Sequence, residues 1–217
     1  MKLSVRGATN VSQTKEIETI ETNFRQRLSV IGYRFQPLKQ KEGSHTNLTQ
    51  ENFGGIRLSD THFDRFCIPG SCWKGAMFVR VAISGGNLEK TNLSRSVLQQ
   101  ADLTKVRAIS ANFRASKWRE VNAMDGNFVR TNLGNAVLKD VNLTRASLFS
   151  AYLQGTRFIR VDLTKADLQY ANLENTIWED ANLANCYVFG AVFTNAKGLS
   201  QEQKIWLRQQ GAFNVPA

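Results

Sequence analysis

Residues 141–175 read VNLTR ASLFS AYLQG TRFIR VDLTK ADLQY ANLEN, and this stretch decides the fold. In each block of five, the middle residue is Leu or Phe, and the first is small or β-branched. The same spacing continues without a slip from Leu48 to Phe193, so that thirty consecutive central positions are apolar. A period of five fits neither the 3.6 residues of a helix turn nor the two-residue period of a plain strand.

A chain with this period can bury its apolar residues if every block forms one short side followed by a corner. The first and middle residues of the block then point inward, and the others face water. Stacked coils of this kind bond to the coils above and below them through their backbones. The sequence therefore predicts an all-β solenoid over residues 46–195.

Blocks such as ADLTK (101–105), ANFRA (111–115) and TNLGN (131–135) resemble the pentapeptide-repeat family, whose unit is A-[DN]-L-x-x. The resemblance covers about two thirds of the chain, and the first blocks, such as ENFGG (51–55), follow it loosely. It implies a right-handed quadrilateral β-helix with four blocks in each coil. Residues 46–195 would then make about seven to eight coils.

The coil 106–125 offers a test of four blocks per turn. Its central residues are Ala108, Phe113, Trp118 and Ala123, two very small and two very large. If they share one layer, the large rings fill the space that the alanines leave, because a packed interior keeps its volume.

Both ends of such a rod need caps, since the last coils expose backbone and core. Residues 196–217 are expected to form a C-terminal capping helix and tail: Ser200 and Gln203 form a capping box, Leu199 packs back, and Gly211 ends the helix. Apolar residues for the last coil come from Ile205, Trp206, Leu207 and Phe213.

At the other end, residues 12–45 are expected to form an N-terminal helix and an irregular cap, after a disordered tail at 1–11. Ile17, Ile20, Phe24 and Leu28 recur at helical spacing. An alternative stays open, in which residues 26–45 form a degenerate first coil, because Leu28, Tyr33 and Leu38 also fit the five-residue register.

Composition sets the expected compartment. Three scattered cysteines do not make a disulfide framework. The N-terminus lacks the apolar stretch of a secretory signal, and no apolar run approaches the ~18 residues of a transmembrane helix. The sequence predicts a cytoplasmic protein, with secretion as a bacterial effector without a cleavable signal peptide as an alternative.

No residue pattern indicates catalysis, a cofactor or a metal. His62, Cys67 and Cys72 are five apart, so they occupy the same outward position on three successive sides and diverge instead of forming a tetrahedral site. The only other histidine is His45, and neither histidine has a Ser or Cys nucleophile beside it in a recognisable motif. We therefore predict that the protein is not an enzyme.

The outward positions predict an interface. With twenty residues per coil, the slot after the central residue on one side contains four large apolar residues, and two tyrosines lie on that side. Contiguous exposed apolar surface usually marks an interaction site. These candidate interface residues, here called the apolar track, are Ile109, Val129, Phe149, Phe189, Tyr170 and Tyr187.

Charge is distributed unevenly along the chain, whose net charge is +10. Residues 46–119 have eleven basic and five acidic side chains, whereas residues 120–195 have six and eight. One local basic cluster stands out as a candidate patch: Arg107, Arg114, Lys117 and Arg119. No aromatic interleaving or known nucleic-acid module accompanies it, so a solvated basic half is favoured over nucleic-acid binding.

The sequence thus predicts a non-catalytic interaction or scaffold protein that presents a rigid surface to a protein partner, or to a second copy through the apolar track or the C-terminal cap. The family resemblance implies two alternatives. One is a regulator of DNA gyrase of the DNA-mimic type, which the positive charge opposes. The other is a secreted bacterial effector. Cyanobacterial relatives are also implied, without a stated role.

Overall fold

The computed structural model describes residues 52–62 and 67–217. Contacts divide the chain into two units, residues 1–47 and 48–217, and the second unit is described here. The expected tail at 1–11, the N-terminal helix at 12–45, its alternative coil at 26–45 and His45 all lie outside the described residues.

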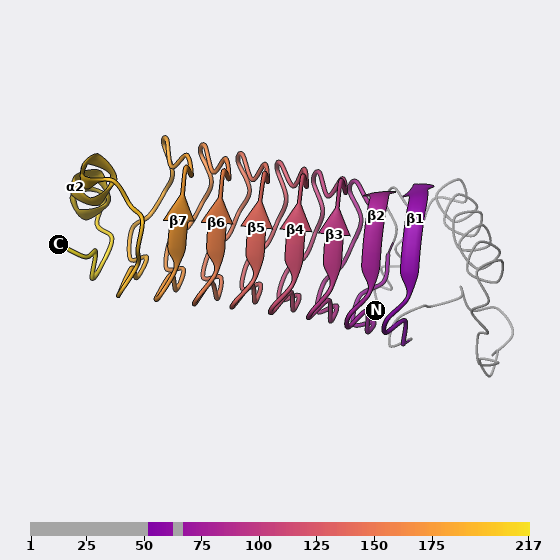
Figure 1. Ribbon diagram of the computed structural model, residues 1–217. Coiled ribbons are helices and arrows are strands. Elements are labelled where there is room, and N and C mark those ends of the chain that lie inside the picture. The colour runs from indigo at the N-terminus through magenta and orange to yellow at the C-terminus, as the bar shows by residue number, and fades with distance from the viewer. Residues whose placement is uncertain (1–51, 63–66) are drawn as a thin grey trace, which may run out of the picture. The chain divides into compact units, whose positions relative to one another are not determined.

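One parallel sheet runs along the length of this unit (Figure 1). Its seven strands follow the chain in order: β1 (Arg57–His62), β2 (Met77–Ala82), β3 (Val97–Gln99), β4 (Lys117–Arg119), β5 (Val137–Lys139), β6 (Arg157–Ile159) and β7 (Ile177–Glu179). Each strand pairs with the one twenty residues later, as Leu98 does with Trp118. Six turns of twenty residues therefore separate β1 from β7, and the predicted four-sided β-helix is confirmed.

The other three sides of each coil are joined by single parallel bridges, again twenty residues apart, such as Asn92↔Asn112. We name the sides in chain order. The sheet side contains β1–β7; the second side has central residues such as Leu143, the third side Leu148, and the fourth side Leu153. In a four-sided coil, the third side lies opposite the sheet side across the core.

Every described corner from Gly55 to Asn195 has left-handed backbone geometry at the second residue after the central one. Most of these residues are not glycine; examples are Arg95 with φ 59° and Asn135 with φ 58°. None of the described corner residues is Val, Ile or Thr, because a β-branched side chain in this conformation is strained. The corner position therefore excludes β-branched residues, a restriction that the apolar pattern alone does not show.

The polar residue that recurs before the central residue of the block also has a local role on three sides of the coil. The side-chain Oδ1 of the Asn or Asp before the central residue accepts a hydrogen bond from the backbone N–H two residues later. Examples are Asp102 to Thr104 at 2.9 Å and Asn172 to Glu174 at 3.0 Å. These turns hold the chain in position to enter the corner.

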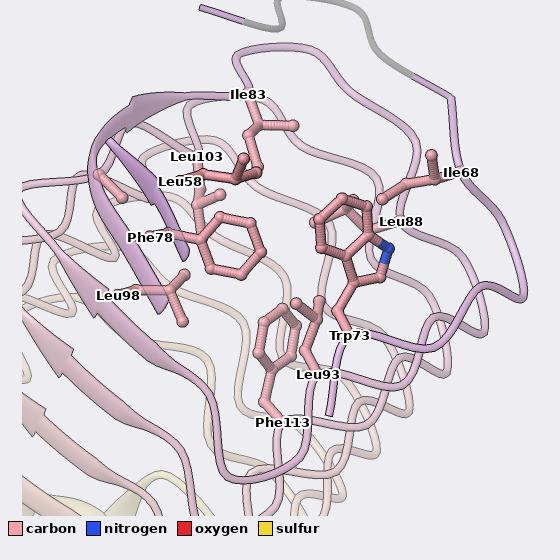
Figure 2. A pocket seen from close by; sticks show the side chains of 11 residues that line it. Leu58, Ile68, Trp73, Phe78, Ile83, Leu88, Leu93, Leu98, Leu103 and Phe113 are labelled. Atoms are coloured by element: carbon pink, nitrogen blue, oxygen red, sulfur yellow. The ribbon is translucent and has the colours of Figure 1, made fainter. Parts of the chain in front are cut away.

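The core is a continuous column of central and small residues, and the central side chains of the first coils converge from all four sides (Figure 2). Leu103, Phe113, Leu133 and Phe158 are fully buried. The space between the residues drawn in Figure 2 is about 10 Å³, at the lower limit for one water molecule. This space is part of a packed interior and is too small for a ligand.

The layer around residues 106–125 confirms the predicted compensation of volume. Ala108 and Ala123 are fully buried, and Phe113 contacts Trp118 edge to face, with 5.1 Å between ring centroids. Phe128 of the next coil adds a third ring, 5.8 Å from Trp118. The large rings therefore fill the layer beside the two alanines.

Two of the buried tryptophans are matched by a hydroxyl two residues earlier in the chain. Trp178 Nε1 donates to Thr176 Oγ1 at 2.9 Å, and that hydroxyl donates to the Leu173 carbonyl at 2.7 Å. Trp73 makes the same bond to Ser71 at 2.7 Å. The small inward position thus provides a partner for the indole N–H at these two sites.

We expect Thr176→Val to destabilise the protein by about 1–3 kcal/mol, because it leaves the buried Trp178 N–H without its partner. Ser116→Ala is the control. Within the described part of the chain, neither Ser116 Oγ nor Trp118 Nε1 has a hydrogen-bond partner, so this change is expected to be neutral or stabilising. Urea unfolding followed by tryptophan fluorescence measures both; equal losses would contradict the role of the Thr176 hydroxyl.

Helix α2 (Gln201–Gln209) closes the C-terminal end beyond β7 (Figure 1). The predicted capping box is confirmed: Gln203 N–H donates to Ser200 Oγ at 3.1 Å, and Ser200 N–H donates to Gln203 Oε1 at 2.9 Å. Leu207 and Leu199 are buried, and Gln203 Nε2 donates to the carbonyl of Ala181 in the last coil.

Two of the predicted cap residues do not cover the core. Ile205 is 47% exposed because it lies two residues from Leu207, on a different face of the helix. The Phe213 side chain is 54% exposed; its backbone pairs with Val192 instead.

Candidate interaction surfaces

His62, Cys67 and Cys72 lie on three different sides of the coil, as predicted from their spacing. The bridges place them there: His62 pairs with Ala82, Cys67 with Asn87, and Cys72 with Asn92. Within residues 52–62 and 67–217, no group of three His, Cys, Asp or Glu side chains is arranged to hold a metal ion.

The third cysteine is a core residue. Cys186 is buried, its thiol donates to the Leu163 carbonyl at 2.9 Å, and burial raises its pKa to about 12. A thiol in this environment stays protonated near neutral pH, so Cys186 is unsuited to act as a nucleophile.

The apolar track lies on the third side and at the corner that follows it. Ile109, Val129 and Phe149 are half-buried. Tyr170, Tyr187 and Phe189 are much more open, at 52%, 60% and 54% exposed. The track is therefore half-buried over its first three residues and more exposed toward its C-terminal end.

Three rings of the track form a ladder. Tyr170 lies edge to face between Phe149, at 5.5 Å, and Phe189, at 5.9 Å, measured between ring centroids. The ladder depends on glycine: a Cβ on Gly190 would lie 2.7 Å from the Tyr170 ring, and one on Gly211 would lie 2.8 Å from Phe189. These contacts hold the rings in position on the surface while leaving more than half of Tyr170 and of Phe189 exposed.

The structure divides the predicted basic patch. Lys117 and Arg119 are the two outward residues of β4, and Arg114 lies on the adjoining fourth side. Arg107 lies on the third side, across the core from β4, where it forms an ion pair with Glu89 at 3.1 Å. Arg107 therefore does not belong to the same surface as the other three.

Sequence reasoning missed a difference between the sides. On the sheet side, the slot before the central residue never contains Asn or Asp: it reads Arg57, Met77, Val97, Lys117, Val137, Arg157 and Ile177. These side chains cannot accept the hydrogen bond that Asn or Asp accepts from the backbone N–H two residues later, and the chain is an extended strand there. Grouping the residues before the central positions by their place in the twenty-residue coil would have shown that one of the four sides lacks Asn and Asp there.

The corner after the sheet side is paired between coils. Arg80 bonds Asp60, Arg160 bonds Asp140 at 2.7 Å, and Gln100 donates to Glu120 at 2.9 Å. The Arg160 guanidinium holds the pKa of Asp140 below its usual value. Asp60 and Asp140 are thus paired with an arginine of the neighbouring coil, whereas the ion-pair partner of Glu120 is the adjacent Arg119.

Comparison with known proteins agrees with this geometry. The family model for pentapeptide repeats matches residues 76–114, 127–164 and 166–197, in eight copies. The chain belongs to the pentapeptide-repeat family. The structure extends the pentapeptide-repeat solenoid to residues 52–62 and 67–75, which the family model leaves out, and through Trp118, which lies in the gap between two matched segments. No curated protein matches the chain.

Solved structures of three pentapeptide-repeat proteins are similar to this chain. A trypsin-treated variant of QnrB1, a plasmid-mediated fluoroquinolone resistance protein, is 15% identical, with 71% of this chain and 96% of that one covered and a TM-score of 0.36. HetL from Nostoc sp. strain PCC 7120, involved in heterocyst differentiation regulation, is 19% identical, with 78% and 95% covered and a TM-score of 0.28. Rfr23 from Cyanothece 51142 is 20% identical, with 81% and 97% covered and a TM-score of 0.29. At these identities the likeness concerns the fold alone.

Among the described residues, no helix has both the length and the apolar character needed to cross a membrane.

Proposed function

We propose that this pentapeptide-repeat protein is a non-catalytic scaffold that binds a protein partner through the apolar track. The observation that carries the proposal is the exposure of Tyr170, Tyr187 and Phe189, each of which leaves more than half of its surface in water. Large exposed aromatic side chains that are held rigidly are typical of interface anchors.

The rigidity of the track favours binding. Tyr170 and Phe189 are fixed by ring contacts and by the two glycines beneath them, so little side-chain freedom is lost when a partner covers them. Burying each such side chain contributes about 1.5–3 kcal/mol before the cost of association. Several together can support a moderate interface.

The proposal predicts that Val129→Glu combined with Tyr187→Glu abolishes binding to the partner, or self-association, and leaves the fold intact. Within the described part of the chain, neither side chain belongs to the ring ladder, and neither is fully buried. Light scattering measures the mass, and circular dichroism checks the fold. Ile177→Glu, on the sheet side and 39% exposed, is the matched control, while Ile205→Glu tests association through the C-terminal cap.

A photo-crosslinking amino acid at position 187 identifies the partner directly. We expect one defined crosslinked protein, or a second copy of this chain, from position 187 and none from position 177. A crosslink pattern that is the same from both positions, or unchanged mass and unchanged partner recovery in the folded double variant, would refute the proposal.

The charge of the chain argues against mimicry of a DNA duplex. A protein with a net charge of +10 does not present the negative potential of a phosphate backbone. Gyrase regulation of that type, secretion as an effector and the cytoplasmic location stay predictions from sequence.

A further inference from the structure

The sheet side has a concentration of unneutralised positive charge on three adjacent strands. Lys117 and Arg119 face outward from β4, Lys139 from β5, and Arg157 from β6. Arg114 precedes β4 on the adjoining side. Arg119 is bonded to Glu120 at 3.1 Å. In the part of the chain that the structure describes, no carboxylate lies within ion-pair distance of the other four, here called the basic quartet: Arg114, Lys117, Lys139 and Arg157.

Nearby acidic groups offset the quartet only in part: beside Arg160, Lys139 is among the charges that lower the pKa of Asp140. Glu120 and Asp140 lie at the following corner, and each already has an arginine partner, Arg119 and Arg160 respectively. The next outward acid on the sheet is Glu179 of β7, which marks the C-terminal limit of the basic surface. On the other side, Val97 and Gln99 of β3 are uncharged. The positive surface therefore lies on β4–β6 and on the corner that leads into the sheet, where the exposed Arg95 of the preceding coil lies next to Arg114.

In the described strands of the sheet side, the basic side chains are not used in hydrogen bonds to the backbone of a turn and are free to contact a ligand. On the other three sides, an Asn or Asp in the slot before the central residue is often occupied by a turn bond, as in Asn132 to Gly134 at 2.9 Å. On the sheet side that slot contains Lys117 and Arg157, which make no such bond among the described residues. Strands lie ~4.8 Å apart and alternate residues ~6.7 Å apart, so the quartet spans an area of roughly 10 by 7 Å or somewhat more.

We infer that this basic surface binds the phosphate backbone of a nucleic-acid duplex without reading its sequence. A duplex presents one charge for about every 1.7 Å of its axis, so ~10 Å of contact offers about six phosphates to four cations. The outward residues of β2–β7 include no aromatic ring, so stacking on single-stranded bases is not supported. On β4–β6 the outward apolar residues are Val137, which is half-buried, and Ile159, which is 9% exposed, so the basic surface offers little apolar area to insert into a membrane.

The test uses the full chain and a labelled 20-base-pair DNA duplex of mixed sequence, with binding followed by fluorescence anisotropy from 50 to 200 mM salt. Four phosphate contacts predict a slope of log K against log salt of about −3.6, hence a loss of affinity of about 150-fold over that range. Arg114→Gln/Lys117→Gln/Lys139→Gln/Arg157→Gln should abolish binding at 50 mM salt.

The matched control removes the same charge from other sides: Lys90→Gln/Lys105→Gln/Arg130→Gln/Lys165→Gln. All four are exposed corner residues of the second and third sides, so the net charge falls equally in both variants. Retention of most of the affinity in the control, together with loss in the quartet variant, supports the inference. Equal weakening would attribute binding to net charge alone and overturn it.

Three other results would also overturn the inference. They are no binding to the duplex at 50 mM salt, tighter binding to single-stranded DNA of the same length, and binding to phosphatidylserine vesicles without binding to the duplex. Circular dichroism of both variants confirms that the solenoid is intact, because all eight substituted side chains are on the surface and not fully buried.

Discussion

Leu153→Asp is expected to destabilise the protein by more than about 4 kcal/mol, because it places a carboxylate inside a dry core. Leu153 is a fully buried central residue of the fourth side. The lost apolar burial alone costs about 1.5–3 kcal/mol, and no charged partner is available inside the column. Since small proteins are stable by about 5–15 kcal/mol, much of the molecule should be unfolded or partly unfolded at ordinary temperature.

The control is the next residue. Gln154 faces outward beside the corner and is half-buried, so Gln154→Asp introduces the same carboxylate at a position that water reaches. We expect a change within about 1 kcal/mol. Urea denaturation at pH 7 measures both variants. Similar stabilities for Leu153→Asp and Gln154→Asp would contradict the assignment of the central position to the core.

Gly198→Ala is expected to detach or displace the C-terminal cap. Gly198 occupies the position that follows Trp178 by one full turn, with φ +84°, and an added Cβ would lie 1.9 Å from the backbone carbonyl oxygen of Trp178. Backbone cannot move aside as the end of a flexible side chain does. The left-handed conformation costs about 1–3 kcal/mol for alanine, and the clash adds to it.

Gly75→Ala separates these two costs. Gly75 has a similar φ of +70°, but nothing lies within 4 Å of an added Cβ. We expect this variant to lose only about 1 kcal/mol, and many corners already contain non-glycine residues in this conformation, including Ala115. Hydrogen exchange of α2 and thermal unfolding distinguish the variants. If the backbone amides of α2 are protected from exchange equally well in the two variants, the close approach of Gly198 to Trp178 is not what holds the cap on the last coil.

Much of the fold could be predicted from the sequence because each block of five repeats the same local task. Leu103, Leu143 and Leu163 are each buried for the same reason. A wrong assignment of one block would leave the register of the following blocks unchanged. The capping box at Ser200 was also predictable, since it depends only on residues three apart. Ile205 was misplaced because an apolar residue in a short helix does not reveal which face meets the last coil.

The candidate surfaces were less predictable, because they depend on residues that meet only after twenty positions. The apolar track was found by sorting residues in this way, but the contact of Tyr170 with Gly190 and Phe189 was not. The basic cluster was read along the chain, which placed Arg107 with Lys117 although a half-turn of the coil separates them.

The five-residue period by itself determined that the first and middle residues of each block point into a packed column and the others into water, and hence that this chain is a solenoid. Only the tertiary structure decided which outward side chains share a surface and which are already paired. Ion pairs such as Arg160 with Asp140, and bonds such as Trp178 with Thr176, depend on rotamers and on the coil above. Local spacing cannot specify them, because the same block pattern is compatible with bonded and unbonded side chains, as Trp178 and Trp118 show.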